Sequence, residues 1–424
     1  MRIVKSLLLG SLEMQKASVL FLSYDGMTDP LGQSQVIPYL AGLSALGYEI
    51  GIVSFEKADR FSKGKEHIAA LLKQHNIAWH PLSYTAKPPI FSTLYDFNRM
   101  AKLVRKLHSE KPIQILHCRS YITALFGLAF KRKTGVKFIF DMRAFYADER
   151  VDGGIWNLKN PIIKLVYNYF KKKEIEFLSE ADYTISLTNA GKQIIHSWNH
   201  IPKQPIPIEV IPCCADLNHF SAKSINNVLA QTYIKTLDLE NAFVVSYLGS
   251  LGTWYLDKEM FKFFKVLKSR YENAKFLIIT PDSANEVRQK AEAEGVNFVD
   301  VRVIFGKRDE VPTLLSLSHI ALFFIQPLFS KKGSSPTKHG EILGMGIPVI
   351  CNAGVGDVEE ITESTHSGIL VREFSDKAFE DAVLKIPEIL ARDKQQFVDA
   401  AQKWYSLSEG IKRYEGVYKA VMSN

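Results

Sequence analysis

The stretch that decides the fold reads GSSPTKHGEILGMGIPVICNAGVGD and spans residues 333–357. Ser335 is a favourable N-cap and Pro336 suits the first helical position, so a helix is expected to begin here. The small residues Gly344 and Gly346 precede a β-branched run, as in a helix that packs closely on the next strand of a sheet. The stretch therefore predicts one helix-to-strand unit of an α/β sheet.

Short β-branched or aromatic runs alternate with longer amphipathic stretches along the rest of the chain, which is typical of βα units on a parallel sheet. The predicted strands are Val19–Ser23, Glu49–Phe55, Ile113–His117, Lys137–Phe140, Tyr183–Leu187, Glu209–Ile211, Phe243–Tyr247, Lys275–Thr280, Val301–Phe305, Ile320–Phe324 and Pro348–Asn352. The helices expected between them include Gln35–Leu46, Phe97–Ser109, Glu259–Arg270, Ser283–Glu294, Val311–Leu317 and Pro336–Met345.

Four prolines cluster between residues 202 and 212, and an uneven, polar-leaning stretch follows them up to about Asn241. Such a stretch marks a domain boundary. We therefore predict an α/β protein with two Rossmann-like, doubly wound parallel-sheet domains that face a cleft. The first domain covers residues 1–218 and the second covers 219–404, and the last helix, 405–424, is expected to pack back on the first domain.

The composition is that of a globular protein, with 46% hydrophobic and 23% charged residues among 424. The net charge of +8 favours anionic partners. No basic tract is interleaved with aromatic residues, so we expect no nucleic-acid partner.

Targeting signals are not predicted. The apolar run Ser6–Gly10 is interrupted by Glu13 and Lys16, and it is too short for a signal peptide or for the roughly 20 residues that span a bilayer. The four cysteines have no CxxC spacing, which indicates reduced thiols. A cytoplasmic protein is expected.

A helix that opens at Asn160-Pro161 combines apolar and basic residues. Its members in 161–173 include Ile162, Ile163, Lys164, Leu165, Val166, Tyr169, Phe170, Lys171, Lys172 and Lys173. One interpretation is a basic amphipathic helix that rests on an anionic membrane, which would place the protein peripherally on its inner face. The other is a core-facing helix whose lysines lie at its solvated end.

The helix start at residues 335–338 is suited to a phosphate, because its free N–H groups point outward at the positive end of the helix dipole. Lys338 in the first turn opposes that dipole unless an anion lies between them, a conflict typical of functional sites. Glu341 shares a helical face with Thr337 and Lys338. Its carboxylate is placed to accept hydrogen bonds from two hydroxyls of a ribose. The alternative is an ion pair with Lys338 on a solvated face of the helix.

Residues 333–357 resemble the donor-binding signature of the family 4 glycosyltransferases, a large retaining group with the GT-B fold. Glu341 matches the second of that family's two glutamates, and Gly346–Ile350 matches its Gly-x-Pro-Val-Val run. The chain departs from the family at the first glutamate, whose position is Gly333. Residues 335–338 instead resemble a subgroup with Ser-Pro-x-Lys in this place.

The N-terminal half shows weaker parts of the same resemblance. The loop before residue 35 is similar to the family's opening glycine loop, and Gly32 is the glycine carried over. His117, followed by Arg119, resembles a strand that ends in Val-His-x-His. Asp141 or Arg143 occupies the neighbourhood of the family's catalytic-site histidine.

The residues 247–251 resemble the first strand of the family's donor domain, which reads Gly-Arg-Leu in many members. Ser250 stands in place of the arginine, and Tyr255 in place of the lysine five residues later. Lys338 is therefore expected to neutralise the donor diphosphate.

The resemblance implies transfer of a sugar, with retention, from a nucleoside diphosphate sugar to a glycan or lipid-linked glycan in cell-surface polysaccharide or glycoconjugate synthesis. No Asp-x-Asp occurs, so no metal and no cofactor are expected. The implied catalytic residues are Asp141, Arg143 and Lys338; the donor-binding residues are Gly32, Ser250, Ser335, Thr337, Lys338 and Glu341; the acceptor-side residues are His117, Arg119 and Glu149.

Two alternatives stay open at this point. One is a sugar-nucleotide epimerase of the same fold, and the other is a catalytically dead protein that binds sugar nucleotides or glycans. The fold does not fix the donor sugar, the base, the acceptor or the linkage.

Overall fold

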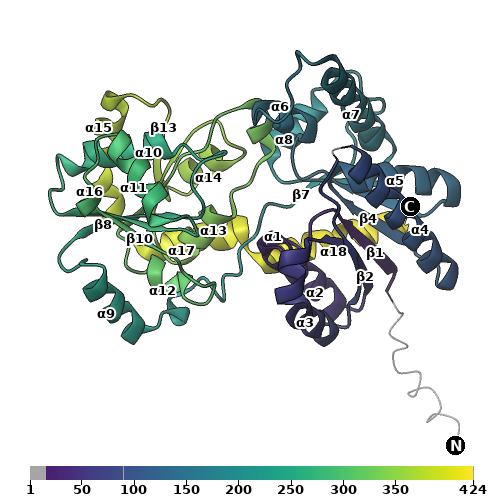
Figure 1. Ribbon diagram of the computed structural model, residues 1–424, viewed down its shortest axis with the longest axis horizontal. Helices are drawn as coiled ribbons and strands as arrows, with labels where there is room; N and C mark the ends of the chain where they lie inside the picture. The colour runs from purple at the N-terminus through teal and green to yellow at the C-terminus, as the bar shows by residue number, and fades with distance from the viewer. Residues whose placement is uncertain (1–15, 89, 424) are drawn as a thin grey trace, which may run out of the picture. The chain divides into compact units, whose positions relative to one another are not determined.

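The computed structural model describes residues 16–88 and 90–423, so the N-terminal run Ser6–Gly10 lies outside the described part (Figure 1). The chain forms two compact units. The first takes the described residues up to Asp141, then Lys173–Thr184 and those from Ile411 onward; the second takes Met142–Lys172 and Ile185–Gly410.

The first sheet has seven strands in the order β3-β2-β1-β4-β5-β6-β7. Strand β1 pairs in parallel with both β2 and β4, so the strand order reverses between β1 and β4. In open α/β sheets the crevice at such a reversal is where ligands bind. The strands are β1 (Ser18–Ser23), β2 (Glu49–Glu56), β3 (Ala78–Ser83), β4 (Ile115–Arg119), β5 (Lys137–Asp141), β6 (Tyr183–Ser186) and β7 (Ile208–Val210).

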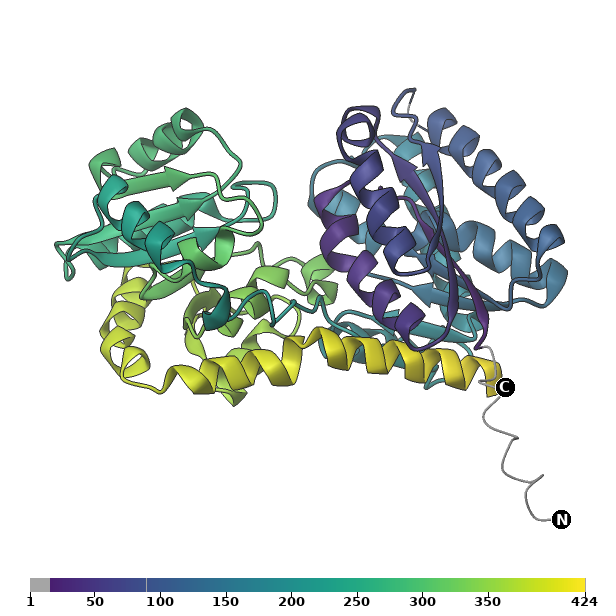
Figure 2. The same ribbon diagram turned by 90° about the horizontal axis from the view of Figure 1, so that it is seen from below.

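The helices of the first unit include the C-terminal part of α18, which Figure 2 shows in yellow. Tyr414 of α18 lies 5.3 Å from the ring centre of Tyr39, and Tyr418 lies 5.2 Å from that of Tyr48. These aromatic contacts hold α18 on the unit. The helices are α1 (Pro30–Gln35), α2 (Ile37–Ala45), α3 (Ala58–Gln74), α4 (Phe91–Glu110), α5 (Ser120–Thr134) and α18 (Leu407–Ser423).

The second sheet has six strands in the order β10-β9-β8-β11-β12-β13 and reverses between β8 and β11. The prediction of two doubly wound parallel sheets is thus confirmed. The strands are β8 (Phe243–Leu248), β9 (Ala274–Ile279), β10 (Val301–Ile304), β11 (Ile320–Phe323), β12 (Val349–Asn352) and β13 (Gly368–Val371).

The core of the second unit is made of aliphatic and aromatic side chains between this sheet and its helices, with Phe261 and Phe264 of α10 and Ile342 of α13 fully buried. The longer helices are α6 (Tyr146–Asp152), α8 (Asn189–His196), α9 (Asn227–Thr236), α10 (Asp257–Lys268), α11 (Ala284–Ala293), α13 (Thr337–Gly344), α14 (Val358–Ser364), α15 (Asp376–Leu384) and α17 (Lys394–Tyr405), with the short α12 (Val311–Leu315) and α16 (Ile386–Leu390). Helix α7 (Pro161–Glu180) contributes to both units.

None of the described helices has the length and apolar character that crossing a bilayer requires. All four cysteines are buried, and none of them is in a disulfide.

Candidate functional site

Helix α13 begins one residue later than predicted. Its N-cap is the extended Pro336, and no side chain caps the helix. The prediction that Ser335 caps it was wrong, because the Ser335 hydroxyl accepts a hydrogen bond of 3.2 Å from the backbone N–H of Cys213. The first turn of α13 is therefore left without an acceptor side chain of its own.

Lys338, in that first turn, is 7% exposed. Its ammonium lies 3.5 Å from the ring centre of Tyr255 and 4.1 Å from that of Tyr247. Its Nζ atom has no hydrogen-bond acceptor among the described residues. A buried cation held only by two aromatic faces is costly unless an anion joins it.

The strand-to-helix loop after β8 is shaped around this ammonium. Gly249 has a φ of +113°, and a Cβ placed there would lie 3.1 Å from the Nζ of Lys338. The hydroxyl of Tyr247 donates to the carbonyl of Ser250 over 2.5 Å, and the backbone of Leu251 donates to Asp282 over 2.6 Å. Ser250 itself is exposed. The loop thus keeps its backbone close to the Lys338 ammonium.

Glu341 lies one turn further along α13 and is half-buried. Burial raises the pKa of its carboxyl to about 7, although Arg308 and Lys338 act in the opposite direction. Burial also holds the pKa of Lys338 well below its ordinary value. No ion pair joins Lys338 and Glu341 within the described part of the chain, and Lys338 is buried, so the solvated pair considered above is excluded.

Arg143 and Ser335 both contact Cys213. The guanidinium of Arg143 lies 3.4 Å from the sulfur of Cys213, whose N–H binds Ser335. Arg143 has a φ of +64°, a strained conformation for a residue with a side chain. Cys213 therefore links Arg143 to Ser335, just before the start of α13. Thr337, the first residue of the helix, is half-exposed.

Glu149 of α6 forms an ion pair of 2.6 Å with Lys331, which the sequence analysis missed. Lys331 is 3% exposed, and its ammonium lies 3.4 Å above the ring of Trp254. A Cβ at Gly333 would lie 3.3 Å from Ala144, so the chain packs closely where the family carries its first glutamate. The only sequence signal for this cluster was the basic pair Lys331-Lys332 ahead of the helix.

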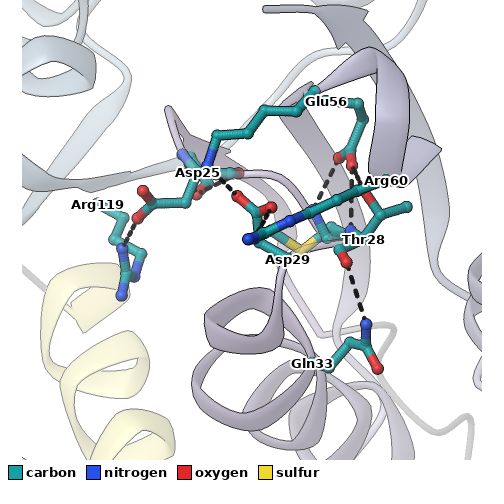
Figure 3. Close-up of polar contacts among 10 residues, drawn as sticks. Asp25, Thr28, Asp29, Gln33, Glu56, Arg60 and Arg119 are labelled. Carbon is teal, nitrogen blue, oxygen red and sulfur yellow. Dashed lines mark hydrogen bonds and ion pairs between the residues drawn. The ribbon is translucent and has the colours of Figure 1, made fainter. Parts of the chain in front are cut away.

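The loop between β1 and α1 is fixed by the buried carboxylate of Glu56, which the sequence analysis also missed (Figure 3). Glu56 accepts hydrogen bonds from the N–H groups of Met27 (2.7 Å) and Thr28 (3.0 Å). A Cβ at Gly32 would lie 2.3 Å from the carbonyl oxygen of Gly26. Gly32 is thus needed for packing, and its approach to a ligand stays a prediction.

His117 and Asp141 are buried together beneath α18. His117 shares a hydrogen bond of 2.8 Å with the hydroxyl of Tyr418, and its Nε2 lies 3.5 Å from Asp141. Tyr414 donates to the same carboxylate over 3.2 Å. Asp141 is 1% exposed, so its catalytic role stays a prediction.

Arg119 lies at the end of β4, 5% exposed, with an ion pair to Asp25 (Figure 3). The predicted residues thus fall into two groups. The second unit holds Arg143, Glu149, Ser250, Ser335, Thr337, Lys338 and Glu341, and the first unit holds Gly32, His117, Arg119 and Asp141.

Two family models match the chain in succession. Glycosyltransferase Family 4 matches residues 32–219, and Glycosyl transferases group 1 matches residues 231–404. No curated protein matches the chain with significant sequence similarity.

Solved structures with the same fold cover the chain almost completely. A glycosyltransferase from Rickettsia africae is 16% identical, with a TM-score of 0.70, and the match covers 96% of this chain and 99% of that one. Anabaena HepE, solved with UDP and glucose, is 14% identical (TM-score 0.65; 94% and 98% covered). Sucrose-phosphate synthase from Thermosynechococcus elongatus is 12% identical (TM-score 0.69; 96% and 100% covered).

Proposed function

We propose that this chain, which belongs to the glycosyltransferases that pair a family 4 domain with a group 1 domain on the GT-B fold, moves a sugar from a nucleoside diphosphate sugar to a glycan or lipid-linked glycan. The observation that carries the proposal is the buried ammonium of Lys338 at the start of α13. It has two aromatic neighbours and no acceptor among the described residues. A donor diphosphate supplies the missing anion.

In the proposed reaction the bond between the anomeric carbon and the diphosphate breaks, and a new bond forms from that carbon to an acceptor hydroxyl. The acceptor proton leaves with the diphosphate or through a base. Negative charge grows on the diphosphate, where Lys338 and the positive end of the α13 dipole stabilise it. Retention of the anomeric configuration is proposed from the family resemblance.

Glu341 is proposed to accept hydrogen bonds from two ribose hydroxyls. It lies one turn from Lys338 on the same helix, and no ion pair within the described residues competes for its carboxylate. Ser335 and Thr337 flank the diphosphate in this arrangement, and Arg143 reaches the same helix start through its contact with Cys213.

A donor screen tests the function directly. Nucleoside diphosphate sugars are ranked by thermal shift, and the best one is then incubated with and without glycan acceptors. Release of nucleoside diphosphate that increases with acceptor, together with a product of unchanged anomeric configuration by NMR, supports transfer. An isomerised donor indicates an epimerase instead, and binding without turnover indicates a dead protein.

We expect turnover to survive EDTA. The reason is that a protein cation, Lys338, is proposed to stabilise the diphosphate, and the sequence contains no Asp-x-Asp pair to hold a metal–diphosphate complex. The initial rate is measured before and after extensive chelation. A rate that falls to background and returns on addition of Mg²⁺ or Mn²⁺ would refute the metal-independent part of the proposal.

We also propose that the protein lies peripherally on an anionic membrane, on its cytoplasmic face, through α7. Ile162, Leu165 and Tyr169 are 62%, 70% and 47% exposed, and their spacing places them on one face of the helix. Lys164 and Lys172 are exposed beside them, whereas Phe170 is buried in the protein. An exposed apolar face with flanking lysines suits the headgroup region of acidic lipids.

Replacing Leu165 by glutamate is expected to weaken binding to phosphatidylglycerol vesicles by about tenfold or more, because a buried leucine contributes about 1.5–3 kcal/mol. Vesicle sedimentation measures the effect. Val228, 80% exposed on α9, provides the matched control, since Val228→Glu adds the same charge away from α7. Equal binding by both variants, or no binding by the parent protein, would contradict the membrane proposal.

A further inference from the structure

Figure 3 shows ion pairs at Asp29 and at Arg119. They differ in which partner is buried. In the first, the carboxylate of Asp29 is the buried partner, with 8% of its side chain exposed. It is paired with Arg60 at 2.5 Å and Lys57 at 3.1 Å. In the second, the guanidinium of Arg119 is the buried partner, and Asp25, its counter-ion, is 51% exposed. The buried carboxylate has two cations, whereas the buried cation has one anion.

The guanidinium of Arg119 has a buried hydrogen-bond donor without an acceptor among the described residues. It carries five N–H donors in a planar fork, and its Nε has no acceptor among the described residues. Nη1 donates to Asp25, whose side chain is 51% exposed. A cation that is 95% buried loses most of its hydration, and a single exposed partner replaces little of it. An oxyanion that takes the place of Asp25 would use more of these donors.

The position of Arg119 in the sheet is one where ligands bind in open α/β folds. Ser23 of β1 and Arg119 of β4 are partners in the parallel register, at the reversal of strand order. Asp141 of β5 faces Arg119 on the other side in register, but its carboxylate is directed to Tyr414 and His117. Asp25 is thus the one carboxylate paired with Arg119 among the described residues.

We infer that Arg119 binds an oxyanion on the sugar acceptor, a carboxylate or a phosphate, and that Asp25 occupies the guanidinium until the acceptor displaces it. A guanidinium pairs with either oxyanion through two parallel hydrogen bonds. The inference rests on the proposed function, because it names the chemical class of that reaction's acceptor. The net charge of +8 agrees with an anionic partner.

The test follows the Nε–H resonance of Arg119 by NMR in the full-length, arginine-labelled protein without donor; Arg119→Lys assigns the signal. The probes are methyl glucuronide, glycerol 3-phosphate and the neutral methyl glucoside. We expect a saturable shift with at least one anionic probe and none with the neutral one. The anion with the lower Kd identifies the group, a sugar carboxylate or a phosphate.

Variants sharpen the test. Because Arg119→Lys lacks the observed resonance, calorimetry with the anionic probe of lower Kd measures the affinity of every variant. We expect Arg119→Lys to weaken anion binding about tenfold or more, because it removes the paired hydrogen bonds but keeps the charge. Asp25→Asn is expected to tighten binding several-fold, since it removes the competing carboxylate. Arg60→Lys, which alters the other ion pair, is the matched control and should leave the Kd unchanged.

The inference is overturned if neither anion shifts the resonance, or if Asp25→Asn weakens binding of the anion that does. It is also overturned if the enzyme glycosylates neutral and anionic acceptors equally well, a result that would leave the proposed function intact. Failure of the proposed function has a different signature, because binding at Arg119 would persist while no donor is consumed.

Discussion

Replacing Lys338 by methionine is expected to lower kcat by about a hundredfold or more, the scale observed when a group that stabilises transition-state charge is removed. The ammonium of Lys338 lies between Tyr247 and Tyr255 with no acceptor among the described residues. No side chain of the 247–255 segment is positively charged. Steady-state kinetics with the donor found by thermal shift measures the loss.

The same variant is expected to keep or raise its melting temperature. Methionine fills a similar volume beside the two tyrosines, and removing an unpaired buried cation relieves a desolvation cost. Lys377, 76% exposed and paired with Asp381, provides the control, and Lys377→Met should be neutral in both measurements. A folded Lys338→Met enzyme with parental turnover would refute the role. The search for the cation would then move to Arg119, Arg143, Lys307 and Arg308.

The sheets could be predicted from sequence because buried parallel strands are continuous apolar runs separated by amphipathic helices. The two strands that were missed, β3 and β13, are at sheet edges. Strand β3 carries Pro81 and has no fully buried residue, and β13 has only four residues. Strand β3 therefore lacks the apolar run on which the prediction depends, whereas β13, which reads GILV, has one and was still not predicted.

The position of Lys338 on its helix could be predicted, but not its burial. Spacing along one helix places Lys338, Thr337 and Glu341 on a common face. The rings that cover the ammonium come from Tyr247 and Tyr255, more than eighty positions earlier in the chain. Local sequence contains no information on that contact. The sequence analysis therefore could not exclude a solvated ion pair between Lys338 and Glu341.

Other site contacts were missed for the same reason. Lys331 meets Glu149 across 182 positions, and Arg119 meets Asp25 across 94. The cap at Ser335 was predicted from local preference, but a distant backbone group, the N–H of Cys213, takes its hydroxyl. Tertiary contacts override local preference where the chain builds its sites.

Replacing Glu341 by alanine is expected to weaken binding of the nucleoside diphosphate sugar about a hundredfold or more, because two hydrogen bonds to a charged group contribute about 1.5–3 kcal/mol each. The fold should persist, since Glu341 is half-buried and alanine favours a helix. Calorimetry measures the affinity. Glu360, exposed on α14, provides the matched control, and parental affinity in Glu341→Ala would exclude the ribose role.

The pH dependence separates the ribose role from a packing role. Because burial raises the pKa of Glu341 to about 7, its carboxylate is mostly protonated at pH 6 and mostly ionised at pH 8. If ionised Glu341 binds the ribose, affinity for a sugar nucleotide rises about tenfold over this range, and Glu341→Gln removes the rise. The raised pKa also means that the carboxyl stabilises the free protein least above pH 7, so Glu341→Gln should gain stability relative to the parent protein as the pH increases from 5 to 8. A parent protein whose affinity is the same at both values would contradict the assignment, because a packing role requires no charge on Glu341.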